Sequence, residues 1–137
     1  MKKAVPVMMS LVLMAAAAVV AAQEQSQAAP PVSWENWQAA RESAAKADNE
    51  GKFKEAYEFY LEYIRQAEGL KQGEIVAWGK NNAAFMLIKM HKQDPMVDLA
   101  PAKTLLEEGM AIPDATADCK KALEMNIAYV DMFLVKK

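Results

Sequence analysis

The sequence predicts an all-α domain of about five helices, and three observations support this fold class. Apolar residues recur at the three- and four-residue spacing of an amphipathic helix in successive segments of the chain. No window shows the sustained alternation of apolar and polar residues that is typical of a strand. The six prolines fall near the N-terminus, in a polar stretch, in loops or at expected helix starts, where they do not interrupt a helix.

The first 22 residues have the layout of a bacterial secretory signal peptide. Two lysines precede an apolar, alanine-rich run, which ends where glutamines begin at Gln23. Val20 and Ala22 place small side chains before a cleavage point that we expect after Ala22. We therefore interpret residues 1–22 as a signal peptide and expect a periplasmic or secreted protein. A retained anchor is the alternative, because about 20 apolar residues can span a bilayer.

Residues 23–32 are polar, contain proline and lack a period, so we interpret them as a flexible tether. Residues 33–137 then have the length of one domain, typically roughly 100–200 residues. The chain has a formal net charge of −2 and no clustered basic face, which argues against nucleic acid as a partner. Cys119 is the only cysteine, so no internal disulfide is possible, and we expect it to be a buried apolar residue on a helix.

The first two helices are expected to form an antiparallel hairpin. Ser33 is a favourable N-cap, and Gly51 ends the first helix, whose inward stripe is Trp37, Ala40, Ala44 and Ala47. The second helix covers residues 53–69, and Tyr63 is the tyrosine of this helix that we expect to be exposed. Its apolar positions at helical spacing are Phe53, Ala56, Tyr57, Tyr60, Leu61, Ile64 and Ala67.

Three further helices follow. The third, residues 74–91, is apolar almost all the way round and is therefore expected to be buried. After a polar loop, the fourth begins near Asp98 and accommodates Pro101 in its first turn. The fifth covers residues 116–135, and its apolar face consists of Cys119, Leu123, Ile127, Val130 and Leu134.

Parts of residues 34–112 resemble the tetratricopeptide repeat (TPR), a helix–turn–helix unit, and especially its kinesin light-chain variant. The residues that carry the resemblance are Gly51, Phe53, Ala56 and Tyr60 in one unit, and Trp78, Asn81, Asn82, Phe85, Ala102, Leu106 and Gly109 in the next. The resemblance implies a short helical-hairpin solenoid of two hairpins plus a C-terminal capping helix. In such a fold the first helices of the hairpins line a groove for a peptide segment or a partner helix.

Two adjacent amides in the third helix are the main candidates for partner binding. In the resembling family such asparagines often face the groove, and the amides of Asn81 and Asn82 can donate and accept hydrogen bonds together. The alternative is that they bond adjacent helices, since a buried amide without a partner costs roughly 1–3 kcal/mol. Lys80, Arg41 and Asn49 are further candidates, because we expect them near the same groove.

We expect a protein-interaction module and not an enzyme. His91 is the only histidine and has no second ligand at metal spacing, so we expect no metal and no other cofactor. No glycine-rich phosphate loop or HExxH motif occurs. Two repeats are fewer than the roughly three that such folds need for stability. The alternative is therefore a structural homodimer or an envelope-assembly component whose groove is buried by another copy.

Overall fold

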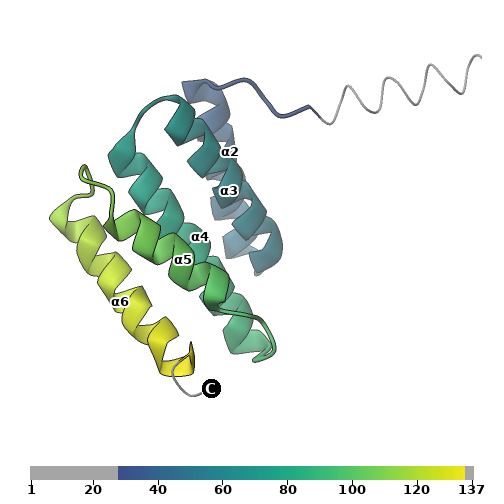
Figure 1. Cartoon of the computed structure of the whole chain (residues 1–137). Helices are drawn as coiled ribbons and strands as arrows, with labels where there is room; N and C mark the ends of the chain where they lie inside the picture. Colours follow the sequence, from purple (N-terminus) through teal and green to yellow (C-terminus); the bar gives the residue numbers. More distant parts are fainter. Residues whose placement is uncertain (1–27, 135–137) are drawn as a thin grey trace, which may run out of the picture. The chain divides into compact units, whose positions relative to one another are not determined.

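The computed structural model describes residues 28–134, and all the regular structure in this part of the chain is α-helical (Figure 1). The predicted all-α fold class is confirmed. The predicted signal peptide and the first half of the predicted tether, residues 23–27, lie outside the described residues. Residues 28–134 form five helices, which are α2 (Trp34–Asn49), α3 (Phe53–Gly69), α4 (Gly73–Gln93), α5 (Ala100–Met110) and α6 (Ala117–Leu134).

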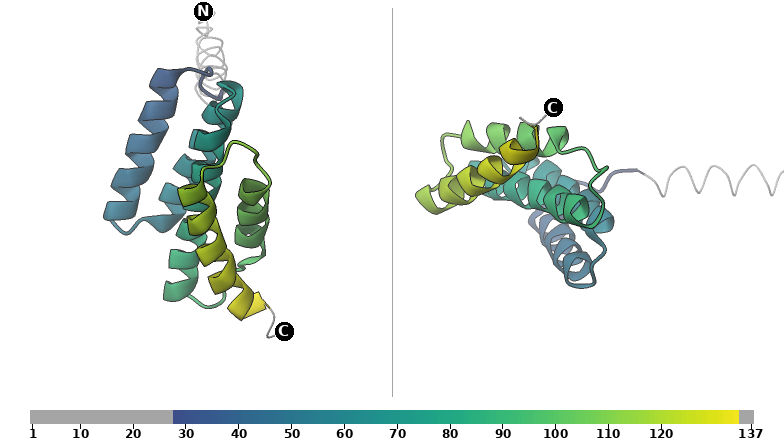
Figure 2. Two further views of the ribbon diagram at one scale, coloured as in Figure 1. Left: turned by 90° about the vertical axis from the view of Figure 1, so that its left-hand side faces the viewer. Right: turned by 90° about the horizontal axis from the view of Figure 1, so that it is seen from below.

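Each helix packs against the next one in the sequence, and neighbouring helices run in opposite directions (Figure 1). α4 has the largest number of helical neighbours, because it packs against α3, α5 and α6. In the left view of Figure 2, α2 and α5 lie at opposite edges of the helices, with α4 between them. α4 is therefore the central element, as its nearly uniform apolar sequence predicts.

Local sequence signals explain where the helices begin and end. Ser33 caps α2, since its Oγ accepts a hydrogen bond from the backbone N–H of Asn36 at 3.0 Å. Gly51 has a φ of +74°, the left-handed conformation that glycine adopts most easily, and it reverses the chain between α2 and α3. Pro101 lies in the first turn of α5, where a missing N–H costs no helical hydrogen bond. α4 ends at Gln93, two residues later than expected, and α5 begins at Ala100.

The core divides into clusters between adjacent helices. The largest joins α4, α5 and α6 and includes Cys119, which is fully buried as expected. A second joins α2, α3 and α4. A third lies near the α2–α3 turn, where Met86 fills the space between Ala47 and Ala56. Small residues of α2 face inward as predicted, and the buried ones are Ala40, Ala44 and Ala47.

One expectation about α3 is wrong. Tyr63, expected to be exposed, is only 7% exposed, while Leu61, one of the apolar positions at helical spacing, is 40% exposed. The reason lies in α4, where Gly79 leaves room for the tyrosine ring. A Cβ at Gly79 would be 2.6 Å from Cδ1 of Tyr63, far closer than van der Waals contact. The absence of a side chain at Gly79 therefore leaves the space that the inward Tyr63 ring occupies.

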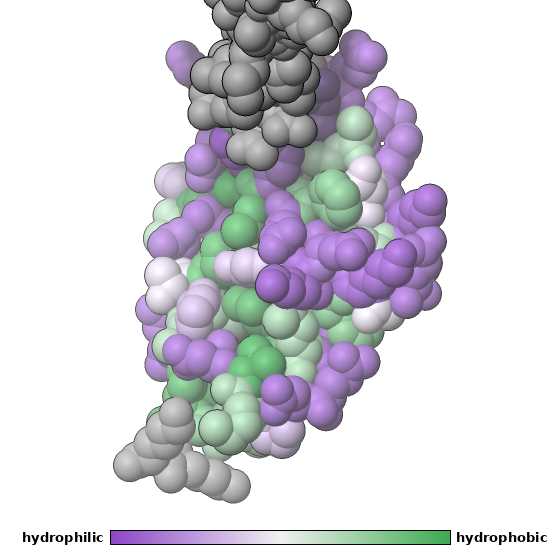
Figure 3. Space-filling view, turned by 90° about the vertical axis from the view of Figure 1, so that its right-hand side faces the viewer, coloured by the Kyte–Doolittle hydropathy of each residue, from purple (hydrophilic) through white to green (hydrophobic). Residues whose placement is uncertain are grey.

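Large apolar side chains also remain exposed at several places. Figure 3 shows the side of the molecule that is on the right in Figure 1, and hydrophobic side chains form a lengthwise band between hydrophilic ones there. Exposed apolar side chains that form a contiguous patch indicate a binding surface, whereas single ones are common on any protein. The exposed large apolar residues are Val32, Trp34, Phe59, Leu61, Phe85, Met96, Met125, Met132 and Phe133.

Candidate functional site

One strip of α4 remains accessible although most of this helix is buried. Asn82, Phe85 and Lys89 follow one another at spacings of three and four residues, so they share one face of α4. Phe85 is exposed, and the other two are half-buried. The strip lies between α2 and α6, because Lys89 contacts α2 and the asparagine beside Asn82 contacts α6. We call Asn82, Phe85 and Lys89 the α4 strip.

Three amides form a chain of hydrogen bonds that ends at the α4 strip. Asn126 Nδ2 on α6 donates to Asn81 Oδ1 at 2.9 Å, and Asn81 Nδ2 donates to Asn82 Oδ1 at 3.4 Å. Asn81 is only 6% exposed, so its amide is satisfied by the adjacent helix. The Asn82 N–H₂ group has no hydrogen-bond acceptor among residues 28–134. The structure therefore brings the two predicted asparagines together but places them in different surroundings.

Asn126 was not among the residues that the sequence predicted for the site. It follows Met125 in a helix whose other apolar residues explain the packing, and nothing in its spacing relates it to Asn81. The sequence gives only an indirect indication that Asn126 is the partner of Asn81. A buried asparagine needs a polar partner, and Asn126 is the only asparagine of α6.

Lys80 lies on a different side of α4 from the α4 strip. Its ammonium forms an ion pair with Glu108 of α5, and only 12% of its side chain is exposed. The pair connects the central helix with α5. Lys80 is therefore the sequence-predicted site residue that α4 directs toward α5, while Asn81 bonds α6.

Lys89 is a second residue that the sequence analysis missed. Its Nζ lies 2.7 Å from Asp48 Oδ1 of α2 and 4.8 Å from the ring centroid of Phe85. It also lies 5.4 Å from the ring of Phe53 at the start of α3. Cation–π contacts of this kind contribute roughly 0.5–1 kcal/mol at exposed sites. Lys89 thus holds the Phe85 ring at the surface between α2 and α4.

Arg41 and Asn49 of α2 do not join the asparagines in one cluster. The Arg41 guanidinium lies 5.8 Å from the ring of Trp37, on its own helix. Asn49 is the exposed last residue of α2. Both side chains are accessible on α2. The α2 residue that contacts the α4 strip is Asp48, which is paired with Lys89.

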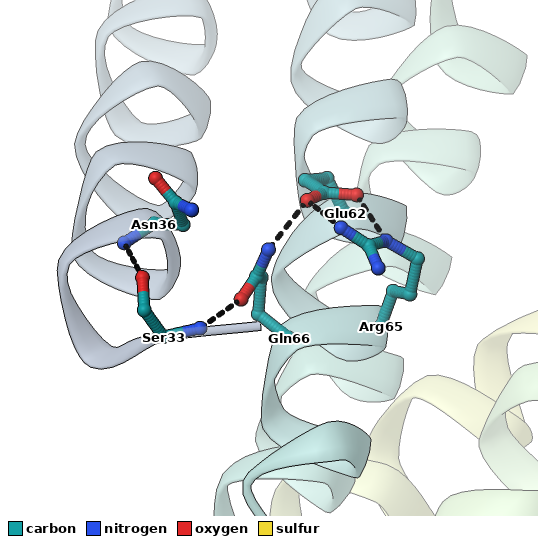
Figure 4. A network of polar contacts seen from close by, with 5 residues as sticks. All are labelled: Ser33, Asn36, Glu62, Arg65 and Gln66. Atoms are coloured by element: carbon teal, nitrogen blue, oxygen red, sulfur yellow. Dashed lines mark hydrogen bonds and ion pairs between the residues drawn. The ribbon is translucent and has the colours of Figure 1, made fainter. Parts of the chain in front are cut away.

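The start of α2 is fixed to α3 by a polar network (Figure 4). The fully buried Gln66 accepts a hydrogen bond from the Ser33 backbone N–H at 2.9 Å and donates to Glu62 at 2.9 Å. Arg65 donates two hydrogen bonds of 2.7 Å to the same carboxylate. These donors, Arg65 first, hold the pKa of Glu62 below its usual value. The network determines where the chain enters the helical domain.

Two aromatic residues near this network differ in exposure. Trp34 is 50% exposed and stands edge-on to Trp37, with ring centroids 5.6 Å apart. Trp37 in turn contacts Tyr63 at 5.3 Å. Burial raises the pKa of the Tyr63 hydroxyl above its usual value.

A hollow of about 700 Å³ lies where the C-terminal ends of α4 and α6 meet the loop between α4 and α5. His91 Nδ1 lies 3.1 Å from the Val97 backbone oxygen, and its ring stands edge-on to Phe133 at 4.8 Å. The described residues contain no group of three or more His, Cys, Asp or Glu side chains arranged for a metal ion. The histidine thus holds the loop to the end of α4.

The comparisons with known proteins leave the family open. Searches against protein-family models, curated proteins and solved structures found no match to this chain. The resemblance to the TPR remains a prediction. None of the helices within residues 28–134 has the length and apolar character needed to cross a membrane.

Proposed function

We propose that this protein is an exported protein-interaction module that binds a peptide segment or a partner helix along the α4 strip. The observation that carries the proposal is the exposure of Phe85 on the most buried helix of the domain. The Lys89 ammonium lies against this ring, and a large exposed apolar side chain gains free energy when a partner covers it.

The amide chain supplies the polar part of such a site. Asn126 orients Asn81, which donates to Asn82, so the Asn82 amide is oriented before a partner arrives. An amide that both donates and accepts suits the backbone of an extended peptide. Phe85 would provide apolar contact, and Asn82 would fix the register of the bound segment.

The N-terminal sequence supports an address outside the cytoplasm. The charged start, the apolar run and the small residues before Gln23 fit a signal peptide that is cleaved after Ala22. The proposal assigns no catalytic step and no cofactor to the protein. Mass spectrometry of the product from an envelope fraction tests the address, because cleavage predicts an N-terminus at Gln23.

Site-specific photocrosslinking tests the interaction itself. A photoreactive phenylalanine analogue at Phe85 is expected to give a discrete protein adduct in cells that produce the full chain. The matched control carries the analogue at Thr104, an exposed position on α5. Adding Asn82→Ala to the Phe85 variant should reduce the adduct. The proposal fails if position 85 gives no adduct, or gives the same adducts as position 104.

A structural homodimer is the second candidate, and the outer face of α6 favours it. Met125 and Met132 are both more than half exposed on the last helix, where a capping helix would present polar side chains. A second copy could cover this face with its own α6 in an isologous contact. Light scattering over a range of concentrations tests this candidate. A dimer that Met125→Glu converts to a monomer would support it, and a monomer at all concentrations would exclude it.

A further inference from the structure

The hollow at the ends of α4 and α6 has the size and lining of a small-molecule site. Its volume of about 700 Å³ lies within the roughly 300–1,000 Å³ that is typical of ligand pockets. The hollow is separate from the α4 strip, because its walls come from the last turn of α4, the loop that follows and the C-terminal end of α6. We define the end hollow by its lining residues His91, Lys92, Pro95, Met96, Val97, Asp98, Leu99, Tyr129, Phe133 and Leu134.

One wall of the end hollow is aromatic. Phe133 contacts both His91 and Tyr129, with ring centroids 4.8 Å and 5.0 Å apart. Edge-on and tilted pairs of this kind hold their rings in place. The wall therefore offers a fixed apolar surface against which a flat or extended hydrocarbon can lie.

The opposite wall is a loop held in shape by its own hydrogen bonds. Asp94 Oδ1 accepts from the Met96 N–H at 3.0 Å, and Val97 is held by the His91 ring. Met96 is 88% exposed at the lip, and a methionine side chain adapts easily to ligands of different shape. Leu99 closes the floor, since it is almost fully buried.

Two charged side chains of opposite sign line the end hollow, and their partners differ. Asp98 Oδ1 accepts a hydrogen bond from the Ala100 N–H at the start of α5, at 2.9 Å. The Lys92 ammonium lies 5.1 Å from the centre of the Tyr129 ring and has no carboxylate within 4 Å in residues 28–134. Its N–H donors therefore have no protein acceptor in that part of the chain. The helix dipole places about half of one negative charge at the C-terminal end of α4, which is less than the full positive charge of Lys92.

We propose that the end hollow binds a small amphipathic organic acid, whose hydrocarbon body lies between the aromatic wall and the loop and whose carboxylate pairs with Lys92. The hydrocarbon body gains from the apolar lining, which makes up most of the surface of the hollow. The carboxylate gains from the Lys92 ammonium, which has no acceptor among residues 28–134. His91 positions the loop and is not itself the anion site. The inference does not depend on partner binding at the α4 strip.

Titration with chains that differ only in the head group tests the proposal. The probes are decanoate, decanol and decyltrimethylammonium, each below its micellar range, added to the protein purified from cells that express the full chain. Isothermal titration gives the affinity, and ¹H–¹⁵N spectra locate the site. We expect saturable decanoate binding, with the largest shifts in residues 94–99 and at the end of α6. Decanoate should bind more tightly than either of the other two probes.

Two variants and one control separate the charge from the hollow. Lys92→Met keeps the aliphatic stem and should weaken decanoate binding about fivefold, in line with the modest strength of an exposed ion pair. Met96→Glu adds a negative charge at an exposed position, where folding is not at risk, and should also weaken it. Lys121→Met, at an exposed position on α6, should change nothing.

Each remaining outcome overturns the proposal. No saturable binding of decanoate would show that the hollow is not a site for such acids. Equal affinity for the three probes, or a Lys92→Met variant that binds decanoate as well as wild type, would show that Lys92 does not select a carboxylate. Shifts centred on Asn82 and Phe85 would place the ligand at the α4 strip instead.

Discussion

The hydrogen bond between Asn81 and Asn126 makes a quantitative prediction about stability. Asn81 is 6% exposed and accepts from Asn126 at 2.9 Å. Replacing Asn126 by alanine removes the donor and leaves the Asn81 oxygen buried without its partner. An unsatisfied buried acceptor costs about 1–3 kcal/mol. Alanine recovers up to about 0.7 kcal/mol through its higher helix propensity, so we expect a net loss of roughly 0.3–2.3 kcal/mol.

A double-mutant cycle isolates the bond from the propensity term. Asn81→Ala and Asn126→Ala each break the same pair, so the double variant should lose less stability than the two single variants together. We expect a coupling free energy of about 1 kcal/mol, within the range for residues in direct contact. The assay is urea unfolding followed by circular dichroism, with comparable m-values as the check that all variants unfold alike.

Two further variants show whether the effect is specific to this pair. Asn49→Ala, at an exposed position, should change the free energy of unfolding by less than about 0.5 kcal/mol. Asn82→Ala should cost less than Asn81→Ala, because its bond is 3.4 Å long and its side chain is partly solvated. A coupling near zero between positions 81 and 126 would refute the reasoning, since the buried amide would then not depend on α6.

Three other predictions follow from the packing and the charges. Gly79→Ala should lower the melting temperature, because its Cβ would lie 2.6 Å from the Tyr63 ring; an unchanged temperature would show that the ring can move aside at no cost. The pKa of Glu62 is lowered mainly by Arg65, so its contribution to stability is present above pH 4.5 and is lost as the pH falls through the lower folded-state pKa. The stability difference between wild type and Glu62→Gln should therefore narrow on acidification, and urea unfolding at several pH values measures it. Burial raises the pKa of the Cys119 thiol, so an aromatic disulfide reagent should label it only as fast as the chain opens; rapid labelling of the folded protein would contradict its burial.

The sequence predicts the helices well because their signals are local. Ser33 caps a helix through a contact three residues away, and Gly51 reverses the chain through its own φ. The alanines of α2 occur at helical spacing and are buried as that spacing requires. None of these inferences depends on knowing which helix lies next to which.

The errors arise where two helices meet. Tyr63 is buried because Gly79, which is 16 positions further along the chain, has no side chain to exclude its ring. Periodicity within α3 gives the angle between residues but not the direction of the helix as a whole. Which residues of α3 face inward depends on the surfaces of α2 and α4, and Gly79 is the place on α4 that has room for the Tyr63 ring.

The same limit applies to the candidate site and explains why the two asparagines differ. Their sequence neighbourhood is shared, and a 100° rotation along α4 is all that separates them. Only the position of α6 decides that Asn81 is satisfied by Asn126 while Asn82 keeps an amide group for a partner. Stability and binding should therefore separate in experiment. Substitution at Asn81 should lower the free energy of unfolding. Substitution at Asn82 should lower the affinity for a partner and leave the free energy of unfolding nearly unchanged. If both substitutions destabilise the fold equally, the amides act together as a packing element and the binding proposal loses its polar contact.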